Sequence, residues 1–374
     1  MHIGFDAKRF FHNPTGLGNY SRSTLAGLMH YFPAHQYYLY SAQIPQSFLA
    51  SQQGHNPVLC QPGPLGQLAP ALWRSLGIPK TAQKDNLHIF HGLSHELPLT
   101  SFGTSTRTVV TMHDLLFLTH PQLYPWLDRH IYRTKYKSSC LRAHCVIAIS
   151  HKTAEDLCEL FAISLDRVRV VYQSYTPHFA IPIHPAARIL LRQKYHLPQE
   201  YIFYVGSLIE RKGVHFLIQA LAKIPSTHRP ALVLAGTGPL QKQLQQDAAT
   251  LGLSSSILFL GRVPDEDLPG LYQMAQVFVY PSLAEGFGIP IVEALASQTP
   301  VITSTGSCFS EPGGDAALYL PPGDISALAH TVEQVLGDNE LRHTMITRGL
   351  KHVQKFHWQQ TSRRLMDVYT ELCP

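Results

Sequence analysis

The fold is decided by the stretch Val277-Phe278-Val279-Tyr280-Pro281-Ser282-Leu283-Ala284-Glu285-Gly286-Phe287-Gly288-Ile289-Pro290-Ile291-Val292-Glu293-Ala294-Leu295-Ala296. Its first four residues are apolar, β-branched or aromatic, which predicts a buried strand that ends at Pro281. Gly286 and Gly288 bracket Phe287, which suits a turn where bare backbone approaches a ligand closely. Pro290 suits the first turn of a helix, because the N–H that proline lacks would have no partner there. The stretch therefore predicts a strand, a tight turn and a helix.

The predicted turn carries candidate binding groups. The backbone N–H groups of Gly288, Ile289 and their neighbours are expected at a helix N-terminus, which favours anions such as phosphates. Glu285 and Glu293 flank this anion site. A phosphate would repel them, so each is expected to accept hydrogen bonds from neutral hydroxyls, and hydroxyls on both sides of a diphosphate describe a sugar nucleotide. A Gly-rich turn with solvated glutamates is the alternative that a bare Glu-Gly-x-Gly leaves open.

Composition limits the class of protein. The chain has 374 residues, of which 45% are hydrophobic and 15% charged, so two domains with large cores are expected. Its net charge of +5 suits anionic small molecules or an anionic membrane surface but supports nucleic acid only weakly, and no nucleic-acid partner is expected.

Cysteine usage and the first residues predict the compartment. The six cysteines form no Cys-x-x-Cys pair, and Met-His-Ile-Gly-Phe-Asp does not read as a signal peptide. A reduced, cytoplasmic protein is therefore expected, and with no apolar run of about 18 residues, no segment is expected to span a bilayer. The 22 histidines show no metal-ligand spacing, so no metal site is expected.

Two further strand ends carry candidate residues. Gly16-Leu17-Gly18 lies in a predicted loop over residues 13–20, between a first strand and a helix from Ser21. Such a loop forms either a phosphate cradle or a tight connection. His113 follows a predicted strand at residues 108–112, at the edge where open α/β sheets gather ligands, although a buried histidine in the core is the alternative.

Basic residues follow another strand. Arg211 and Lys212 lie between a predicted strand at 201–205 and a helix at 214–222. Together they can hold a diphosphate, Arg through its planar fork and Lys as a compact charge, although basic loop residues are more often simply exposed. Residues 232–239 also read as a strand followed by a Gly-rich turn, and residues 257–263 as a strand followed by a turn.

A predicted helix over residues 126–143 carries Arg129, Arg133 and Lys137 at intervals of four. This stripe is either a solvated face or a surface that contacts anionic lipid. The stretch from Ser41 to about Lys84 shows few strong periods and is expected to be irregular. Four prolines between residues 176 and 198 predict the interdomain linker.

The pattern Pro-Ser-x-x-Glu-Gly-Phe-Gly-Ile-Pro from Pro281, with a second Glu at 293, resembles the signature of retaining glycosyltransferases of family 4, the glycosyl transferases group 1. The resemblance implies the α/β fold called GT-B, two Rossmann-like domains that face an interdomain cleft. It implies an acceptor-side domain over residues 1–180, a nucleotide-sugar-binding domain over 181–355, and a C-terminal helix over 356–374 that returns to the N-terminal domain.

The resemblance also implies roles. Glu285 contacts the donor sugar, Glu293 binds the ribose, His113 faces the sugar, and Lys212 corresponds to the phosphate-binding Lys. Ser207 stands where Arg is often found, so Arg211 is expected to share that duty. The other residues expected at the donor are Gly16, Leu17, Gly18, Gly236, Arg262, Val263, Gly286, Phe287, Gly288 and Ile289.

The implied reaction is transfer of a hexose, with retention, from a nucleotide-diphosphate sugar to a hydroxyl of a glycan or lipid-linked acceptor, as in polysaccharide biosynthesis. No cofactor or metal is implied. The N-terminal text is similar to that of mannosyltransferases, and a place at the inner face of the membrane is compatible with the basic stripe. A GT-B nucleotide-sugar epimerase and a catalytically silent nucleotide-binding partner are the alternatives.

Overall fold

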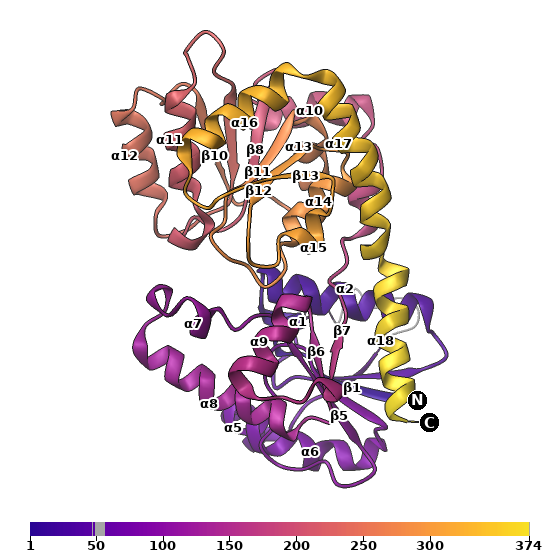
Figure 1. Cartoon of the computed structure of the whole chain (residues 1–374). Helices are drawn as coiled ribbons and strands as arrows, with labels where there is room; N and C mark the ends of the chain where they lie inside the picture. Colours follow the sequence, from indigo (N-terminus) through magenta and orange to yellow (C-terminus); the bar gives the residue numbers. More distant parts are fainter. Residues whose placement is uncertain (47, 49–56, 374) are drawn as a thin grey trace. The chain divides into compact units, whose positions relative to one another are not determined.

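The computed structural model describes residues 1–46, 48 and 57–373 (Figure 1). The chain divides into two compact units. The first comprises Met1–Ser174 together with Trp358–Pro374, and the second comprises Tyr175–His357. The limits expected from the sequence lie after residues 180 and 355. Among the described residues, no helix is long and apolar enough to cross a membrane.

The first unit is built on a parallel sheet with the strand order β3-β2-β1-β4-β5-β6-β7. Its strands are β1 (His2–Asp6), β2 (Gln36–Tyr40), β3 (Val58–Cys60), β4 (Ile89–Gly92), β5 (Arg107–Met112), β6 (Cys145–Ala148) and β7 (Val168–Val170). Its α-helices are α1 (Lys8–His12), α2 (Gly16–Tyr31), α4 (Pro64–Leu68), α5 (Pro70–Leu72), α6 (Ile78–Ala82), α7 (Leu116–Thr119), α8 (Trp126–Arg142), α9 (His151–Phe161) and α18 (Trp358–Leu372). The C-terminal helix α18 packs against α2, as Figure 1 shows in yellow and indigo.

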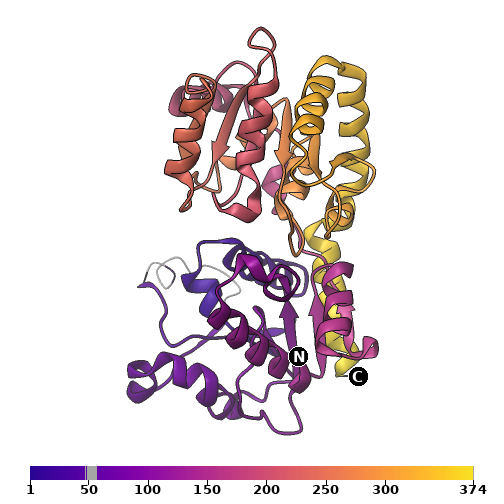
Figure 2. The same cartoon turned by 60° about the vertical axis from the view of Figure 1, so that its left-hand side comes forward.

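The second unit is built on another parallel sheet, with the order β10-β9-β8-β11-β12-β13. Its strands are β8 (Tyr201–Val205), β9 (Ala231–Ala235), β10 (Ile257–Gly261), β11 (Val277–Tyr280), β12 (Val301–Ser304) and β13 (Ala317–Leu320). Its α-helices are α10 (Pro185–Tyr195), α11 (Val214–Lys223), α12 (Gln241–Thr250), α13 (Leu268–Met274), α14 (Ile289–Ala296), α15 (Ser310–Gly313), α16 (Ile325–Gly337) and α17 (Asn339–His352). Figure 2 shows helices on both sides of this sheet.

The buried strands explain why both sheets are parallel. Every residue of β11 is buried, as is every residue of β4 and β6. Strands covered on both faces read as continuous apolar runs, and crossover helices provide that cover. The prediction of a strand at 277–280 and of a helix after the turn is confirmed, since β11 has those bounds and α14 begins at Ile289.

The order of the strands creates a switch point in each sheet. In the second unit β8 leads by way of α11 to β9 on one side, whereas its other neighbour, β11, leads by way of α14 to β12 on the opposite side. The loops that leave the carboxyl ends of β8 and β11 therefore diverge, and ligands of open α/β sheets bind at this point. In the first unit the corresponding neighbours are β1 and β4.

Two expectations for the first unit are wrong in detail. The helix expected from Ser21 begins at Gly16, because the Asn13 side-chain oxygen accepts hydrogen bonds from the Thr15 and Gly18 N–H groups and supports an earlier start. The stretch expected to be irregular contains β3, α4, α5, a π-helical turn at Trp73–Gly77 and α6. Residues 47 and 49–56 of that stretch lie outside the described residues.

Candidate active site

The loops after β8 and β11 are held together by their backbones. The Leu283 N–H donates a hydrogen bond of 2.8 Å to the Arg211 carbonyl. Gly213, at φ 65°, passes so close to Pro281 that a Cβ atom would lie 2.2 Å from the Pro281 carbonyl oxygen. Only glycine fits this position, which is why the helical turn Glu210–Lys212 can bring two basic side chains to Glu285.

Glu285 joins these basic residues in an ion triad, defined here as Arg211, Lys212 and Glu285. Lys212 Nζ lies 2.6 Å from Glu285 Oε1, and Arg211 Nη1 lies 2.7 Å from Glu285 Oε2. The three side chains are 17%, 13% and 9% exposed for Arg211, Lys212 and Glu285. Lys212 also donates to the Tyr280 hydroxyl at 2.6 Å, and this hydroxyl donates to Glu285 Oε1 at 3.1 Å. Each carboxylate oxygen therefore has a cationic partner.

The triad holds its glutamate ionised. Burial alone would raise the pKa of Glu285, but the charges of Lys212 and Arg211 outweigh it and lower this pKa to about 2. Burial lowers the pKa of Lys212, against the raising effect of Glu285. Two cations and one carboxylate leave a net positive charge at the switch point.

The turn after Glu285 ends at a helix N-terminus. Gly288 has φ 97° and precedes α14, so the positive end of the helix dipole lies at Gly288 and Ile289. Phe287 is 2% exposed and its ring packs 5.5 Å from that of Phe356. The Phe287 side chain therefore anchors the turn in the core of the second unit and leaves ligand contact there to backbone atoms.

Glu293, on α14, lies in a different environment. The Tyr272 hydroxyl donates to Glu293 Oε2 at 3.2 Å, and no basic side chain in the described part of the chain forms an ion pair with Glu293. Its removal from water, with a smaller effect of Asp265, raises the pKa of Glu293 to about 7. The pKa values of Glu285 and Glu293 are thus shifted in opposite directions.

Glycines end the three strands beside this site. A Cβ atom on Gly236, at φ 139°, would lie 1.9 Å from the Gly206 carbonyl oxygen, and the Gly236 N–H donates to the Gly261 carbonyl at 2.7 Å. The carboxyl ends of β8, β9 and β10 therefore form a close row of bare backbone. Ser207 and Arg262 are exposed at this edge, whereas Val263 is buried.

In the first unit, His113 is a buried, hydrogen-bonded residue. Its Nε2–H donates to the Leu93 carbonyl at 2.9 Å, and its Nδ1 lies 3.4 Å from the Gln173 side-chain nitrogen. The Tyr20 ring meets it edge-on at 4.7 Å. Burial, helped by the neighbouring His95, lowers the pKa of His113 to about 3. The imidazole is therefore neutral at pH 7 and fixed in orientation.

The glycines of the first loop form the first turn of α2. Gly16 is open, because none of the described residues outside its own helix turn places an atom within 4 Å of a Cβ added there, whereas a Cβ on Gly18 would lie 1.8 Å from the Asn13 carbonyl oxygen. Gly18 is thus required for local packing, while Gly16 and Leu17 lie at the positive end of a 16-residue helix.

The predicted residues gather in two groups, one in each unit. The second unit carries Ser207, Arg211, Lys212, Gly236, Arg262, Val263, Glu285, Gly286, Phe287, Gly288, Ile289 and Glu293 on loops or helix starts beyond the sheet's carboxyl edge, and the first unit carries Gly16, Leu17, Gly18 and His113. The structure brings Arg211, Lys212 and Glu285 into direct contact.

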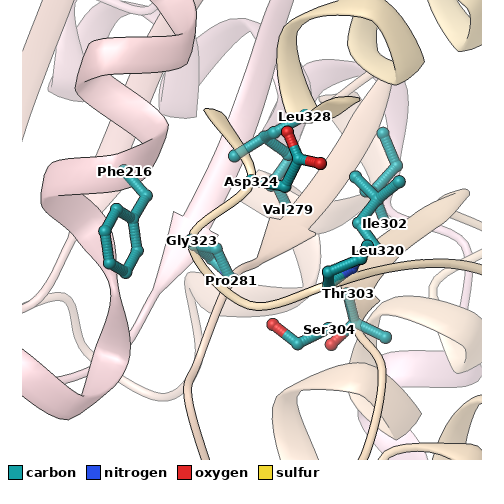
Figure 3. A pocket seen from close by; sticks show the side chains of 11 residues that line it. Phe216, Val279, Pro281, Ile302, Thr303, Ser304, Leu320, Gly323, Asp324 and Leu328 are labelled. Carbon is teal, nitrogen blue, oxygen red and sulfur yellow. The ribbon is translucent and has the colours of Figure 1, made fainter. Parts of the chain in front are cut away.

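A separate hollow lies at the carboxyl ends of β11, β12 and β13. Figure 3 shows Phe216 of α11 on one side and Asp324 and Leu328 on the other. The hollow offers about 10 Å³ to the centre of a water-sized molecule, which is room for roughly one water. It is too small for a sugar nucleotide, and the triad does not line it.

Comparison with known proteins decides the family. Residues 188–352 match the family "Glycosyl transferases group 1", and residues 16–179 match "Glycosyltransferase Family 4". The chain is 33% identical over 287 residues to the O-antigen chain mannosyltransferase B of Escherichia coli, covering 75% of this chain and 74% of that protein. The chain belongs to the family 4 glycosyltransferases of group 1. It is therefore an enzyme of the glycosyltransferase class, and neither the epimerase nor the silent partner is favoured.

Another relative and a solved structure extend the comparison. The serotype-specific mannosyltransferase WbdA of Escherichia coli is 30% identical over 291 residues, covering 75% of this chain but 36% of that protein. Anabaena Alr3699/HepE, solved in complex with UDP and glucose, matches with a TM-score of 0.77 and 22% identity, over 99% of this chain and 100% of that one. At that identity the likeness shows the fold, and the expected GT-B fold is confirmed.

Three residues that contact the ion triad or the Glu285 backbone were not predicted. The sequence marks Tyr280 only as the last residue of a strand, although its hydroxyl contacts both Lys212 and Glu285. An aromatic hydroxyl at the carboxyl end of a central strand was the available signal. Ser307 and Cys308, which contact the Glu285 backbone, carry no local signal.

Proposed function

We propose that this glycosyltransferase moves a hexose from a nucleotide-diphosphate sugar to a hydroxyl of a glycan or lipid-linked acceptor, with retention of anomeric configuration. The observation that carries the proposal is the ion triad of Arg211, Lys212 and Glu285 at the switch point of the second sheet. It supplies positive charge and a hydrogen-bond acceptor on adjacent atoms, as a sugar diphosphate requires.

The positive groups match the charge that the reaction develops. When the glycosidic bond to the diphosphate breaks, negative charge grows on the leaving group and positive charge on the sugar ring. Arg211, Lys212 and the N-terminus of α14 would stabilise the leaving diphosphate. Such preorganised electrostatics is usually the largest contribution to catalysis. These groups provide the positive charge themselves, so the proposal includes no metal ion and no cofactor.

The two glutamates would bind opposite ends of the donor. Glu285 stays ionised and would accept hydrogen bonds from sugar hydroxyls, and Glu293 would accept them from the ribose. The bare edge formed by Gly206, Gly236 and Gly261 would let the nucleobase lie against backbone atoms, with Val263 below it.

The proton of the acceptor hydroxyl would pass to the leaving phosphate oxygen. His113 is neutral, and its two ring nitrogens face the Leu93 carbonyl and the Gln173 side chain, which fix the ring. Its proposed role is therefore to position the sugar and not to transfer a proton. Attack assisted by the leaving group on the same face of the sugar retains the configuration and needs no protein base.

A mannosyl donor is proposed from the two named mannosyltransferase relatives. The first test is thermal shift with GDP-mannose, UDP-glucose and ADP-glucose, since a ligand at 100 times its Kd stabilises the folded state by about 2.7 kcal/mol. Turnover with the stabilising donor follows, for wild type and Lys212→Ala. Lys242→Ala, exposed on α12, is the matched control.

The expected result is loss of at least about 100-fold in turnover for Lys212→Ala and none for Lys242→Ala, since removing one stabilising donor costs that much. Wild-type turnover in Lys212→Ala overturns the site. A product of inverted anomeric configuration overturns the retaining mechanism. Formation of an epimer without acceptor supports the epimerase instead.

We also propose that helix α8 binds an anionic membrane from the cytoplasmic side. Trp126, Leu127 and Ile131 are 70%, 59% and 38% exposed near its start, which is costly in water unless the face is covered. Arg133 is exposed beside them, and Arg129 and Lys137 are half-buried along the same helix. Exposed apolar and basic side chains together suit the interface of anionic lipid.

Vesicle co-sedimentation tests this second proposal. The protein is expected to bind vesicles that contain phosphatidylglycerol but not vesicles of phosphatidylcholine alone, and high salt is expected to release it. Trp126→Ser with Leu127→Ser should abolish binding, whereas Leu165→Ser, exposed in a turn outside α8, should not. Equal binding to both kinds of vesicle, or none to either, contradicts the proposal.

A further inference from the structure

The loop after β12 adopts an unusual backbone conformation. Gly306 has φ 77° and Ser307 has φ 49°, so two consecutive residues lie in the left-handed region. For a non-glycine residue this costs free energy and persists only where the surroundings compensate. Interactions of the side chain at residue 307 are therefore expected to offset this cost, which a glycine would not incur.

The Ser307 side chain forms two hydrogen bonds with the backbone of Glu285. Ser307 Oγ accepts a hydrogen bond of 3.1 Å from the Glu285 N–H and donates one of 2.9 Å to the Glu285 carbonyl. The next residue contacts the same backbone, because Cys308 Sγ lies 3.1 Å from the carbonyl oxygens of both Glu285 and Phe287. The bonds span the loops of two neighbouring strands, β11 and β12.

We propose that Ser307 is a positioning residue for Glu285. This inference rests on the proposed function, in which the Glu285 carboxylate contacts the donor sugar. The carboxylate is anchored by Arg211 and Lys212 through the ends of two long side chains, whereas Ser307 holds the backbone from which the carboxylate extends. Without it the ion triad persists, yet its position relative to the donor is no longer set.

Ser307→Gly separates positioning from folding. Glycine relieves the strain at φ 49°, and this gain offsets most of the free energy of the two lost hydrogen bonds, so the melting temperature should stay within about 3 °C of wild type. A displacement of about 1 Å costs up to about 100-fold in rate, so kcat should fall by roughly 10- to 100-fold and the donor KM by less than about threefold either way. Ser310→Ala, exposed at the start of α15, should change neither.

Conservative rescue provides a readout that stability alone would not move. Asparagine tolerates the left-handed region and carries both a donor and an acceptor, so Ser307→Asn should recover most of the kcat that Ser307→Gly loses. Ser307→Ala keeps neither bond and retains the backbone strain, so it should lose both activity and thermal stability.

A double-mutant cycle tests whether the effect passes through Glu285. In a Glu285→Gln background, Ser307→Gly should cost less than about threefold, because residues that act as a unit are not additive. Full additivity, or wild-type kcat in Ser307→Gly, overturns the inference. In either case the wild-type protein still turns over, so the proposed function stands. Absence of turnover in the wild type with every sugar nucleotide would instead overturn the proposed function.

Discussion

Replacing Glu285 by glutamine should destabilise the second unit by about 3 kcal/mol at neutral pH. The folded-state pKa of Glu285 is about 2, against an ordinary value of 4.5, and at 1.36 kcal/mol per pH unit this difference is worth about 3 kcal/mol. The side chain is 9% exposed, so solvent screens the pairs little. Breaking a buried pair by removing one partner costs about 3–5 kcal/mol, which agrees.

The same pKa sets the direction of the pH dependence. A carboxyl whose pKa is depressed on folding stabilises the protein above its unfolded pKa, and this contribution is lost as pH falls through the folded pKa. The difference between wild type and Glu285→Gln should therefore be full above pH 4.5 and should shrink between pH 4.5 and about 2.

Urea unfolding with two probes measures this effect. The chain has three tryptophans, Trp73, Trp126 and Trp358, and all lie in the first unit. Tryptophan emission therefore reports that unit, while far-UV circular dichroism reports both. Glu285→Gln should shift the dichroism transition more than the emission transition. Glu266→Gln, exposed in the second unit, is the matched control and should stay within about 0.5 kcal/mol.

A loss below about 1 kcal/mol for Glu285→Gln, or a difference that does not shrink on acidification, would refute the electrostatic account of the triad. Adding Lys212→Met to Glu285→Gln gives a second check. The double variant should recover part of the lost stability, because one cation without a counter-ion is then removed from the site.

Three further outcomes are expected. The pKa of Glu293 is raised to about 7, so its contribution to stability is present below pH 4.5 and is lost as pH rises through 7. Glu293→Gln should therefore make the free energy of unfolding depend less on pH between 4.5 and 7. An unchanged pH profile contradicts this. Gly236→Ala should destabilise by at least about 2 kcal/mol, because its Cβ would meet the Gly206 carbonyl at 1.9 Å, and an unchanged melting temperature would show that the backbone can yield. Tyr369→Phe removes the hydrogen bond of 2.6 Å to buried His91 and should cost about 1–3 kcal/mol in the tryptophan-monitored transition, whereas a cost under about 0.5 kcal/mol would mean that the histidine finds another partner.

Local features of the second unit follow from the sequence, because they depend on neighbours in the chain. The apolar runs at 201–205 and 277–280 become β8 and β11 with those bounds. The Gly-rich turns after them place Lys212, Glu285 and Glu293 where ligands of α/β sheets are bound. The first unit was less predictable. Its loop at 13–20 and the stretch at 57–85 depend on capping and packing, which no local period in the sequence reveals.

The contacts within the site could not be read from the chain. Lys212 and Glu285 are 73 residues apart, and they meet because β8 lies beside β11 although β9 and β10 intervene in the sequence. Likewise Tyr369 of α18 reaches His91 across 278 residues. A pattern of side chains can show that each residue ends a strand, but it does not order the strands.

By itself, then, the sequence determined the residue types, the turn that ends at Gly288 and the family to which they belong, because each is encoded within a few positions of the chain. The tertiary structure decided the ionisation of those groups. Glu285 and Glu293 stand eight positions apart on the same strand-turn-helix, yet one meets two cations and the other a tyrosine hydroxyl, so their pKa values move in opposite directions. Burial and the sign of nearby charge set a pKa, and both come from segments that only the folded sheet brings together.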